Sequence, residues 1–244
     1  MALALREKLM MLTPPSLFYR WRIAEEARSG EPELAALPEL VPRGGTAIDA
    51  GANLGVYAYA LADISDRVIA FEPNPDYAFF ARFMLRGRAE VRELALSDAS
   101  GRETFYVPLS DAGRVLYLAG SLKRTHSQFR NMKTYDVEVR ALDDCGLTDV
   151  RFIKADVEGS EREVLDGARA TIKRDRPTML LELLSGTHQD PGSYTAAICE
   201  SFGYDAFIVQ HGEKVAALPA IIALGKNTTW GTDIETRNVL FLPR

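Results

Sequence analysis

The residues with the clearest chemical meaning form the segment Asp49-Ala50-Gly51-Ala52-Asn53-Leu54-Gly55. The segment follows a short apolar run and precedes apolar residues at helical spacing, which predicts a turn from a buried strand into a helix. Gly51 would let the backbone turn sharply and let a ligand approach it closely. The first N–H groups of the helix could receive a carboxylate or a phosphate. Such turns also occur in purely structural connections, so the meaning of this one depends on its neighbours.

Polar residues also follow the next two predicted strands. Glu72 comes 21 residues after Gly51, where an acid can accept hydrogen bonds from both hydroxyls of a ribose. Ser97 and Asp98 follow the third strand, where a short polar side chain could meet the amino group of an adenine. Because parallel strands end at one edge of a sheet, these positions together predict a nucleoside site. Its expected residues are Asp49, Gly51, Ala52, Asn53, Gly55, Glu72, Pro73, Ser97, Asp98 and Asp156.

The turn also indicates which nucleoside cofactor is bound. A dinucleotide site usually has three glycines there, so that a pyrophosphate can lie against the backbone. This turn has only Gly51 and Gly55, and Asp49 would repel a pyrophosphate but suit a cationic amine or sulfonium. We therefore expect S-adenosylmethionine. Two alternatives stay open, a nicotinamide-dependent oxidoreductase and a non-catalytic nucleoside-binding module; the acids Asp156 and Glu182 argue against the second.

A second group of ionisable residues surrounds the end of the predicted strand 150–155. Lys154 and Asp156 share a face if the strand extends that far, and Glu182 ends the adjacent predicted strand. Unpaired carboxylates repel each other, so acids at one sheet edge imply that a hydroxyl acceptor, a cation or a sulfonium lies nearby. The expected catalytic residues are Asp156, His188, Glu182 and Lys154.

A general base would take the proton of an acceptor hydroxyl. We expect this base to be Asp156, followed in preference by His188 and then Glu182. His126 is a further candidate, and Glu158 is equally well interpreted as a loop carboxylate that caps the next helix. Alternatively, Asp156 and Glu182 could hold Mg²⁺ or Ca²⁺, which prefer oxygen ligands; we favour the interpretation without a metal.

The elements that must hold these residues alternate between strand and helix from residue 46 onward. Expected strands are 46–50, 68–71, 91–96, 150–155, 178–183 and 238–242, and expected helices begin after Gly55, at Asn74 and Ser160, and at Tyr194. Asn74 is expected to cap its helix ahead of Pro75, and Ser160 with Glu163 to form a capping box. The alternation predicts an α/β fold, with a parallel sheet covered by helices on both faces.

Two segments interrupt this alternation. Residues 103–109 and 135–142 alternate apolar and polar side chains, which is typical of a half-exposed antiparallel pair. The polar and basic segment 110–134 between them is interpreted as a lid that selects the substrate, with a solvated loop as the alternative. Residues 205–209 and 214–218 are expected to form a hairpin.

Residues 1–43 are expected to form a helical arm, interrupted at Pro14-Pro15, ahead of a single domain at 44–244. The apolar residues of the arm would pack on the domain or on a second copy, which makes a homodimer possible. A membrane-surface helix is the alternative. We favour packing because Glu25 and Glu26 follow the apolar residues directly.

The composition narrows the classes of function. Charged residues make up 26% and hydrophobic residues 47% of the 244-residue chain, as in an ordinary globular protein. The net charge of -5 disfavours nucleic acid as a partner, because nucleic-acid-binding domains carry a basic excess. No apolar run reaches the length of about 20 residues that a transmembrane helix needs. Cys145 and Cys199 have no metal-ligand or disulfide spacing, which suits a reducing compartment, and we expect a cytoplasmic protein.

The order of several strings resembles the FkbM-type methyltransferases. The strings are AIDAGANLG, VIAFEPNP, ALSDASG, FIKADVEGSEREVLDGA and MLLEL, and they lie within roughly residues 30–184, with a weaker echo at 238–240. The resemblance implies a class I enzyme that uses S-adenosylmethionine and mostly methylates hydroxyl oxygens, on glycan sugars or natural products. It also implies a Rossmann-like, seven-stranded mixed sheet whose last strand is antiparallel. Ala155 and Ser160 depart from residues common in the family, and segments 1–30 and 110–134 do not resemble it, which leaves the acceptor open.

Overall fold

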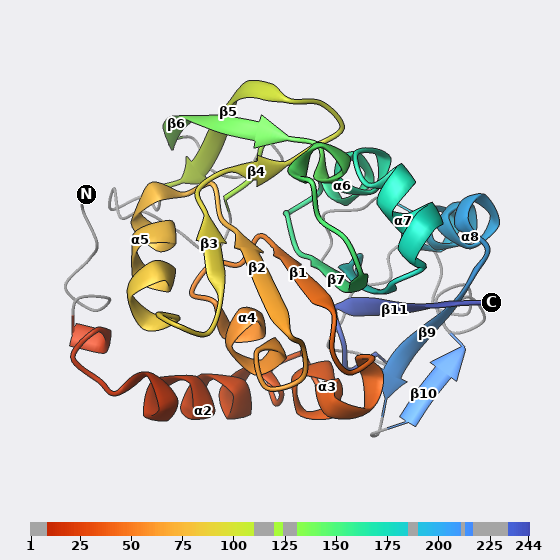
Figure 1. Ribbon diagram of the computed structural model, residues 1–244, viewed down its shortest axis with the longest axis horizontal. Coiled ribbons are helices and arrows are strands. Elements are labelled where there is room, and N and C mark those ends of the chain that lie inside the picture. Colours follow the sequence, from red (N-terminus) through yellow and green to blue (C-terminus); the bar gives the residue numbers. More distant parts are fainter. Residues whose placement is uncertain (1–8, 110–119, 124–130, 185–189, 211–212, 217–233) are drawn as a thin grey trace.

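The centre of the molecule is an eight-stranded sheet in the order β10-β9-β11-β8-β7-β1-β2-β3 (Figure 1). The computed structural model describes residues 9–109, 120–123, 131–184, 190–210, 213–216 and 234–244. The strands of this sheet are β1 (Thr46–Ala50), β2 (Arg67–Phe71), β3 (Glu90–Arg92), β7 (Val150–Ala155), β8 (Thr178–Glu182), β9 (Tyr204–Gln210), β10 (Glu213–Ala216) and β11 (Asn238–Pro243). The neighbours β3, β2, β1, β7 and β8 run parallel, so their carboxyl ends share one edge.

Strand β11 lies between β8 and β9 and is antiparallel to both. The expected mixed sheet with an antiparallel last strand is therefore confirmed, and β10 adds an eighth strand, antiparallel to β9, at the edge. Because β11 runs against β8, its first residue, Asn238, pairs with Glu182, the last residue of β8. The chain just before β11 is thereby brought to the edge at which the parallel strands end.

Helices cover both faces of the main sheet, as the alternation predicted (Figure 1). They are α2 (Pro15–Glu26), α3 (Glu33–Leu40), α4 (Val56–Leu61), α5 (Pro75–Met84), α6 (Glu161–Asp166), α7 (Arg169–Asp175) and α8 (Pro191–Phe202), with the short 3-10 helix η2 (Leu142–Cys145). Helices α2 to α5 pack on one face against residues such as Phe152 and Leu180. Helices η2, α6, α7 and α8 pack on the other face against Ile153 and Leu181. Adjacent residues of β7 and β8 thus enter opposite core layers, as in strands buried on both sides.

A second sheet of three strands, in the order β4-β6-β5, lies beside the main one (Figure 1). Its strands are β4 (Ala95–Leu96), β5 (Gly101–Pro108) and β6 (Met132–Arg140), and β5 and β6 form the predicted antiparallel pair. The prediction of a single strand at 91–96 is wrong, because β3 stays in the main sheet while Ala95 and Leu96 pair with β6. The physical reason is burial. Ala95 packs with Val137 and Val139 of β6, whereas Glu93 between the two short strands is exposed.

Most of the predicted lid, at 110–119 and 124–130, lies outside the described residues. Residues 132–134 belong to β6 and not to a loop. In the piece 120–123, Ser121 exchanges two backbone hydrogen bonds with Tyr106 of β5, at 2.8 and 3.0 Å. The Ser121 hydroxyl also donates to the carbonyl of Glu158 at 2.9 Å. This piece therefore connects the small sheet to the loop that follows β7.

Two predicted helix starts have different outcomes. Asn74 caps α5 as predicted, because its side chain accepts a hydrogen bond from an N–H of the first turn. The capping box predicted at Ser160 is wrong, since the Ser160 side chain makes no capping hydrogen bond. The Glu161 carboxylate instead accepts the N–H groups of Val157 and Gly159, at 3.0 and 3.1 Å. The positive φ of Gly159, 99°, folds this loop back over the start of α6. Among the described helices, none is long and apolar enough to cross a membrane.

The turn between α6 and α7 leaves no room for a side chain at Gly167. A Cβ there would lie 2.0 Å from the carbonyl oxygen of Ser97, which belongs to the backbone and cannot move aside cheaply. We expect Gly167→Ala to lower the free energy of unfolding by about 3 kcal/mol, measured by urea denaturation. Gly101→Ala is the matched control, because a Cβ at Gly101 meets nothing within 4 Å, and its cost should stay within about 0.5 kcal/mol. Equal costs for the two variants would contradict the packing argument.

Candidate active site

A cavity of about 350 Å³ lies at the edge where β1, β2, β7 and β8 end. Among the described residues, eight acidic and three basic side chains line it. The acidic ones are Glu25, Glu26, Glu31, Asp49, Glu72, Asp156, Glu158 and Glu182, and the basic ones are Arg22, Lys154 and Arg237. Phe105 of β5 and Leu122 of the piece 120–123 contribute apolar surface. The excess of acids favours ligands that are cationic or that donate hydrogen bonds.

Most of the predicted nucleoside residues meet in this cavity. Those that line it are Asp49, Gly51, Ala52, Asn53, Glu72, Pro73 and Asp156. Gly55, Ser97 and Asp98 are not among the lining residues: Gly55 precedes α4, Ser97 is buried, and Asp98 is exposed. Ala95 and Leu96 of β4 line the cavity instead. Strand β4 therefore offers apolar groups to the cavity next to Ser97 and Asp98, for which the sequence suggested a polar contact to adenine.

The turn after β1 is held by its neighbours. The N–H groups of Gly51 and Ala52 donate to the last carbonyl of β2 at 2.9 and 3.0 Å, and the N–H of Asn53 donates to Glu72 at 2.7 Å. The N–H groups of these three turn residues are therefore already used, and they are distinct from the first N–H groups of α4, which the sequence suggested for a carboxylate or a phosphate. A Cβ at Gly51 would lie 1.9 Å from the carbonyl oxygen of Asp156. Glycine is thus required there by the backbone that follows β7 and by the sharp turn, in which Gly51 has a φ of 79°; the close approach of a ligand stays a prediction.

Asp49 is buried at the end of β1, where it serves two neighbours. Its carboxylate accepts a hydrogen bond of 2.9 Å from the N–H of Ala58, in the first turn of α4. It also lies opposite Lys154 in the register between β1 and β7. Burial raises the pKa of Asp49 to about 7, although Lys154 and the Ala58 N–H both act to lower it. Asp49 therefore caps α4 and lies opposite a buried lysine in the sheet register while it lines the cavity.

Glu72 is a rigid acceptor at the end of β2. One carboxylate oxygen accepts the N–H of Asn53 at 2.7 Å, and the other accepts the N–H of Asn74 at 2.8 Å. Burial raises the pKa of Glu72 to about 7, against these two hydrogen bonds. Each carboxylate oxygen has two lone pairs, so each can accept one further hydrogen bond from the cavity side. That arrangement fits two neighbouring hydroxyl groups.

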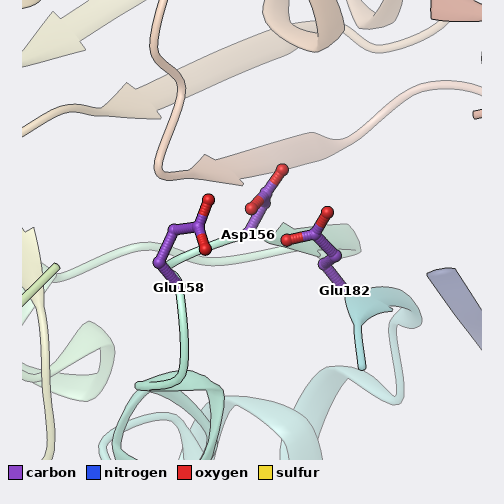
Figure 2. A group of neighbouring side chains, drawn as sticks. All are labelled: Asp156, Glu158 and Glu182. Atoms are coloured by element: carbon purple, nitrogen blue, oxygen red, sulfur yellow. The ribbon is translucent and has the colours of Figure 1, made fainter. Parts of the chain in front are cut away.

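Three carboxylates converge at the ends of β7 and β8. Asp156 follows β7, Glu158 lies two residues later, and Glu182 is the last residue of β8. Figure 2 shows the three side chains pointing toward one another, and one oxygen of each lies within 4.8 Å of the other two. Glu158 and Asn53 have φ angles of 53° and 51°, which residues other than glycine rarely adopt. Such backbone conformations tend to gather at functional sites.

Two buried or half-buried cations flank these carboxylates. Lys154 is 1% exposed, and its Nζ lies 3.5 Å from the Asp156 carboxylate. The Nε of Arg237 lies 3.7 Å from Glu182, and another nitrogen of the same guanidinium lies 3.0 Å from Glu31. The structure thus brings together Asp156, Glu182 and Lys154, as the sequence predicted. The other two catalytic candidates, His188 and His126, lie outside the described residues.

The charge of each group is set by its neighbours. Burial acts to lower the pKa of Lys154, but Asp156 and other carboxylates outweigh it, so this pKa is raised and the lysine stays protonated. Burial acts to raise the pKa of Asp156, but Lys154 and a hydrogen bond with Glu182 bring it below its usual range. Burial and the Asp156 charge raise the pKa of Glu182 well above its usual range and that of Glu158 to about 8. These pKa directions favour the ionised form at Asp156 and the protonated form at Glu182 and Glu158 near neutral pH.

The neighbouring cations explain, without a metal, how three acidic side chains can lie so close together. The sequence left Mg²⁺ or Ca²⁺ open at Asp156 and Glu182, and the structure adds Glu158 to these possible oxygen ligands. However, Lys154 and Arg237 already supply positive charge, and the proton on Glu182 removes one negative charge. A divalent cation in the same place would be repelled by the buried ammonium 3.5 Å from Asp156.

Sequence reasoning missed the residues that the two end regions of the chain bring to the cavity. Glu31 comes from the connection between α2 and α3, and Arg237 precedes β11. Near them, the buried Glu33 accepts hydrogen bonds from the hydroxyl of Thr236 and from the side-chain amide of Asn238. An antiparallel last strand begins at the edge where parallel strands end. That rule could have pointed to Arg237, whereas nothing local in the sequence points to Glu31.

Comparisons with known proteins support the family that the order of the sequence motifs suggested. The sequence profile described as the Methyltransferase FkbM domain matches residues 49–209. The 2-O-methyltransferase NoeI of Sinorhizobium fredii is 29% identical over 144 residues, which cover 53% of this chain and 59% of that protein. The crystal structure of methyltransferase FkbM from Methylobacillus flagellatus has a TM-score of 0.51 and 17% identity, and covers 96% of this chain and 57% of that chain. This chain therefore spans less than two thirds of the length of both relatives.

Glu33 should make the stability of the fold depend on pH. Burial raises its pKa from the usual 4.5 to about 7. The folded state therefore keeps a proton that the unfolded state has lost, and stability decreases as pH rises through this window. Glu33→Gln removes the titrating carboxyl and with it this pH-dependent contribution to the free energy of unfolding. We expect the free energy of unfolding of the variant, relative to the parent, to rise by about 2–3 kcal/mol between about pH 5 and pH 8.

Urea denaturation at several pH values would measure this difference. Glu103→Gln is the control, since Glu103 is an exposed residue of β5, and its stability curve should stay parallel to that of the parent. A Glu33→Gln curve that also runs parallel would show that the Glu33 carboxyl does not titrate as described.

Proposed function

The chain belongs to the FkbM methyltransferase family, and on this premise we propose that it transfers the methyl group of S-adenosylmethionine to a hydroxyl oxygen of a sugar, glycan or natural product. One observation carries the proposal. An ionised carboxylate, Asp156, is held between a buried lysine and a protonated glutamate. It shares the cavity with Glu72, whose oxygens can accept two hydroxyls. A proton acceptor and a nucleoside site therefore adjoin each other.

The residues present fit this cofactor. Glu72 would accept hydrogen bonds from the two ribose hydroxyls, one on each oxygen. The acid-rich lining, which includes Asp49, would offset the positive charge of the sulfonium and the amino group. When bound, S-adenosylmethionine supplies a methyl group that is activated by the positive sulfur. The role of Ser97 and Asp98 toward an adenine remains a prediction from the sequence.

A dinucleotide fits the same residues less well. A pyrophosphate needs N–H donors at the turn after β1, and those of Gly51, Ala52 and Asn53 are bound to β2 or to Glu72. The phosphates would also lie among carboxylates. This observation argues against a nicotinamide-dependent oxidoreductase. The cluster of buried charges beside Asp156, with the positive φ of Glu158, argues against a module that only binds a nucleoside.

The chain's own residues would then act on the acceptor. Asp156 would accept the proton that the acceptor hydroxyl loses as its oxygen takes the methyl group, so that one C–O bond forms and one C–S bond breaks. Lys154 would stay protonated and hold Asp156 in place, and Glu182 would donate a hydrogen bond to it. Alignment of the two reactants in the cavity would supply a further large part of the rate.

The charge of the lining indicates which acceptors fit. Carboxylates at Glu25, Glu26 and Glu31 would accept hydrogen bonds from sugar hydroxyls, or pair with an ammonium group. They would repel phosphorylated or uronic acid acceptors. We therefore favour a neutral or cationic polyol. The similarity to a 2-O-methyltransferase supports oxygen as the methylated atom.

Titration with S-adenosylhomocysteine tests the cofactor assignment. The parent protein should bind it, and should not bind NAD or NADP. Glu72→Ala removes charge-assisted hydrogen bonds, and we expect it to weaken binding by about 1.5–3 kcal/mol. Glu103→Ala, an exposed acid of β5, is the control and should bind like the parent. Unchanged affinity in Glu72→Ala, or equal binding of NAD, would remove the support for this cofactor.

Transfer of a labelled methyl group tests Asp156. The screen would use neutral glycosides, amino sugars and uronic acids as acceptors, with and without a chelator. On the acceptor that is methylated, Asp156→Asn keeps the shape but removes the charge, so turnover should fall by about 10²–10⁴ while cofactor affinity stays near that of the parent. Asp205→Asn is the isosteric control, at an exposed position of β9 outside the cavity lining. Normal turnover in Asp156→Asn would exclude Asp156 as the base, and inhibition by the chelator would favour a metal.

A further inference from the structure

The outer face of α2 and the surface around it expose large apolar side chains to water. On α2, Leu17 is 61% and Trp21 is 48% exposed; before it Leu12 is 80% exposed, and at the end of α5 Phe83 is 45% exposed. We call these residues, with the neighbouring arginines, the arm surface. It consists of Leu9, Leu12, Leu17, Arg20, Trp21, Arg28, Phe83 and Arg86.

The members of the arm surface are neighbours in the fold. Leu17, Trp21 and Arg28 recur at spacings of four and seven, which places them on one side of α2 and its C-terminal extension. Phe18, on the inner side of α2, packs edge-to-face on Phe80 of α5, with ring centroids 5.6 Å apart. A shallow groove lined by Leu12, Phe83 and Arg86 joins the end of α5 to the chain ahead of α2. Figure 1 shows α2 and α5 together at the left of the molecule.

The arm surface is basic, although the chain as a whole carries a net charge of -5. Among the described residues, Arg20, Arg28 and Arg86 have no carboxylate partner; Arg28, which follows α2, donates to the backbone carbonyl of Ala24 in that helix. The two acids that made a membrane helix unattractive from the sequence do not face this side freely. Glu26 lines the cavity, and both Glu25 and Glu26 form ion pairs with Arg22. The Glu25 side chain stays 43% exposed, so these contacts weaken the sequence-based reason against a membrane surface but do not remove it.

We propose that the arm surface binds the face of an anionic lipid bilayer. Leucine and aromatic side chains on one side of a helix enter the headgroup region, and tryptophan favours that depth. The three arginines would be attracted by the negative headgroups. A second copy of the chain is a poorer occupant, because a two-fold contact through this surface would bring like-charged arginines together. The proposal is independent of the reaction catalysed in the cavity.

Sedimentation of the full chain with vesicles tests the proposal. Vesicles of phosphatidylcholine containing about 30% phosphatidylglycerol should bind the protein, vesicles of phosphatidylcholine alone should bind it much more weakly, and added salt should reverse the binding. Replacing Arg20, Arg28 and Arg86 with Gln should weaken binding about fivefold for each arginine removed. Trp21→Ala should weaken it about tenfold.

The matched control removes three cations elsewhere, with Arg102, Arg162 and Lys173 replaced by Gln on β5, α6 and α7, where all three are exposed. This variant should bind vesicles like the parent. Urea denaturation should show that every variant is folded. The proposal is overturned if the parent does not bind anionic vesicles, or if both triple variants bind equally. A dimer in analytical ultracentrifugation that Trp21→Ala dissociates, without vesicle binding, would instead assign the surface to a second copy.

Discussion

A buried ammonium group determines how the charges of this molecule are arranged. Lys154 is 1% exposed on a central strand, and removing such a group from water costs several kcal/mol unless carboxylates surround it. The register of the sheet supplies them, with Asp49 opposite on β1 and Glu182 at the end of β8. These acids repel one another, and protons on Glu182 and Glu158 together with a second cation, Arg237, reduce that repulsion. The acidic cavity is a consequence of this requirement.

The need to balance these buried charges also involves residues near the two ends of the chain. Arg237 reaches Glu182 only because β11 begins where β8 ends. The same arginine pairs with Glu31, and Glu33 bonds to Thr236, so the helical arm is tied to the start of β11. The arm is therefore part of the cavity wall and not an appendage. Its inner side supplies acids to the site, which leaves its outer side free to be apolar and basic.

The sequence predicted the features that depend on local pattern. Apolar runs that stop at Gly51, Glu72 and Asp156 located the strand ends, and therefore most of the cavity. It did not predict contacts that depend on distant pairing. Ala95 and Leu96 pair with β6, where they are buried, and not with the main sheet. Arg237 lies at the cavity because β11 pairs with β8.

The sequence also left open which side chains would accept hydrogen bonds from the backbone at the helix starts. Ser160 and Glu163 have the spacing of a capping box, yet Glu161 binds the loop N–H groups, because the loop folds back over the helix start. Asp49 was predicted as a counter-charge for a cofactor. It also caps α4 through Ala58, nine residues later, and a motif within the turn itself does not reveal that hydrogen bond.

The position of β11 has a consequence for biosynthesis. It lies between two strands made earlier, and the contacts Glu31–Arg237 and Glu33–Thr236 join residues 206 and 203 positions apart. Contacts of such separation form late, because a long loop must close first. A nascent chain still on the ribosome can build the parallel half of the sheet, but its carboxylates lack Arg237 and an edge of β8 is unpaired. The cavity is therefore completed only after translation has passed β11, and a chain stalled before that point lacks the contribution of Arg237 to the cavity wall.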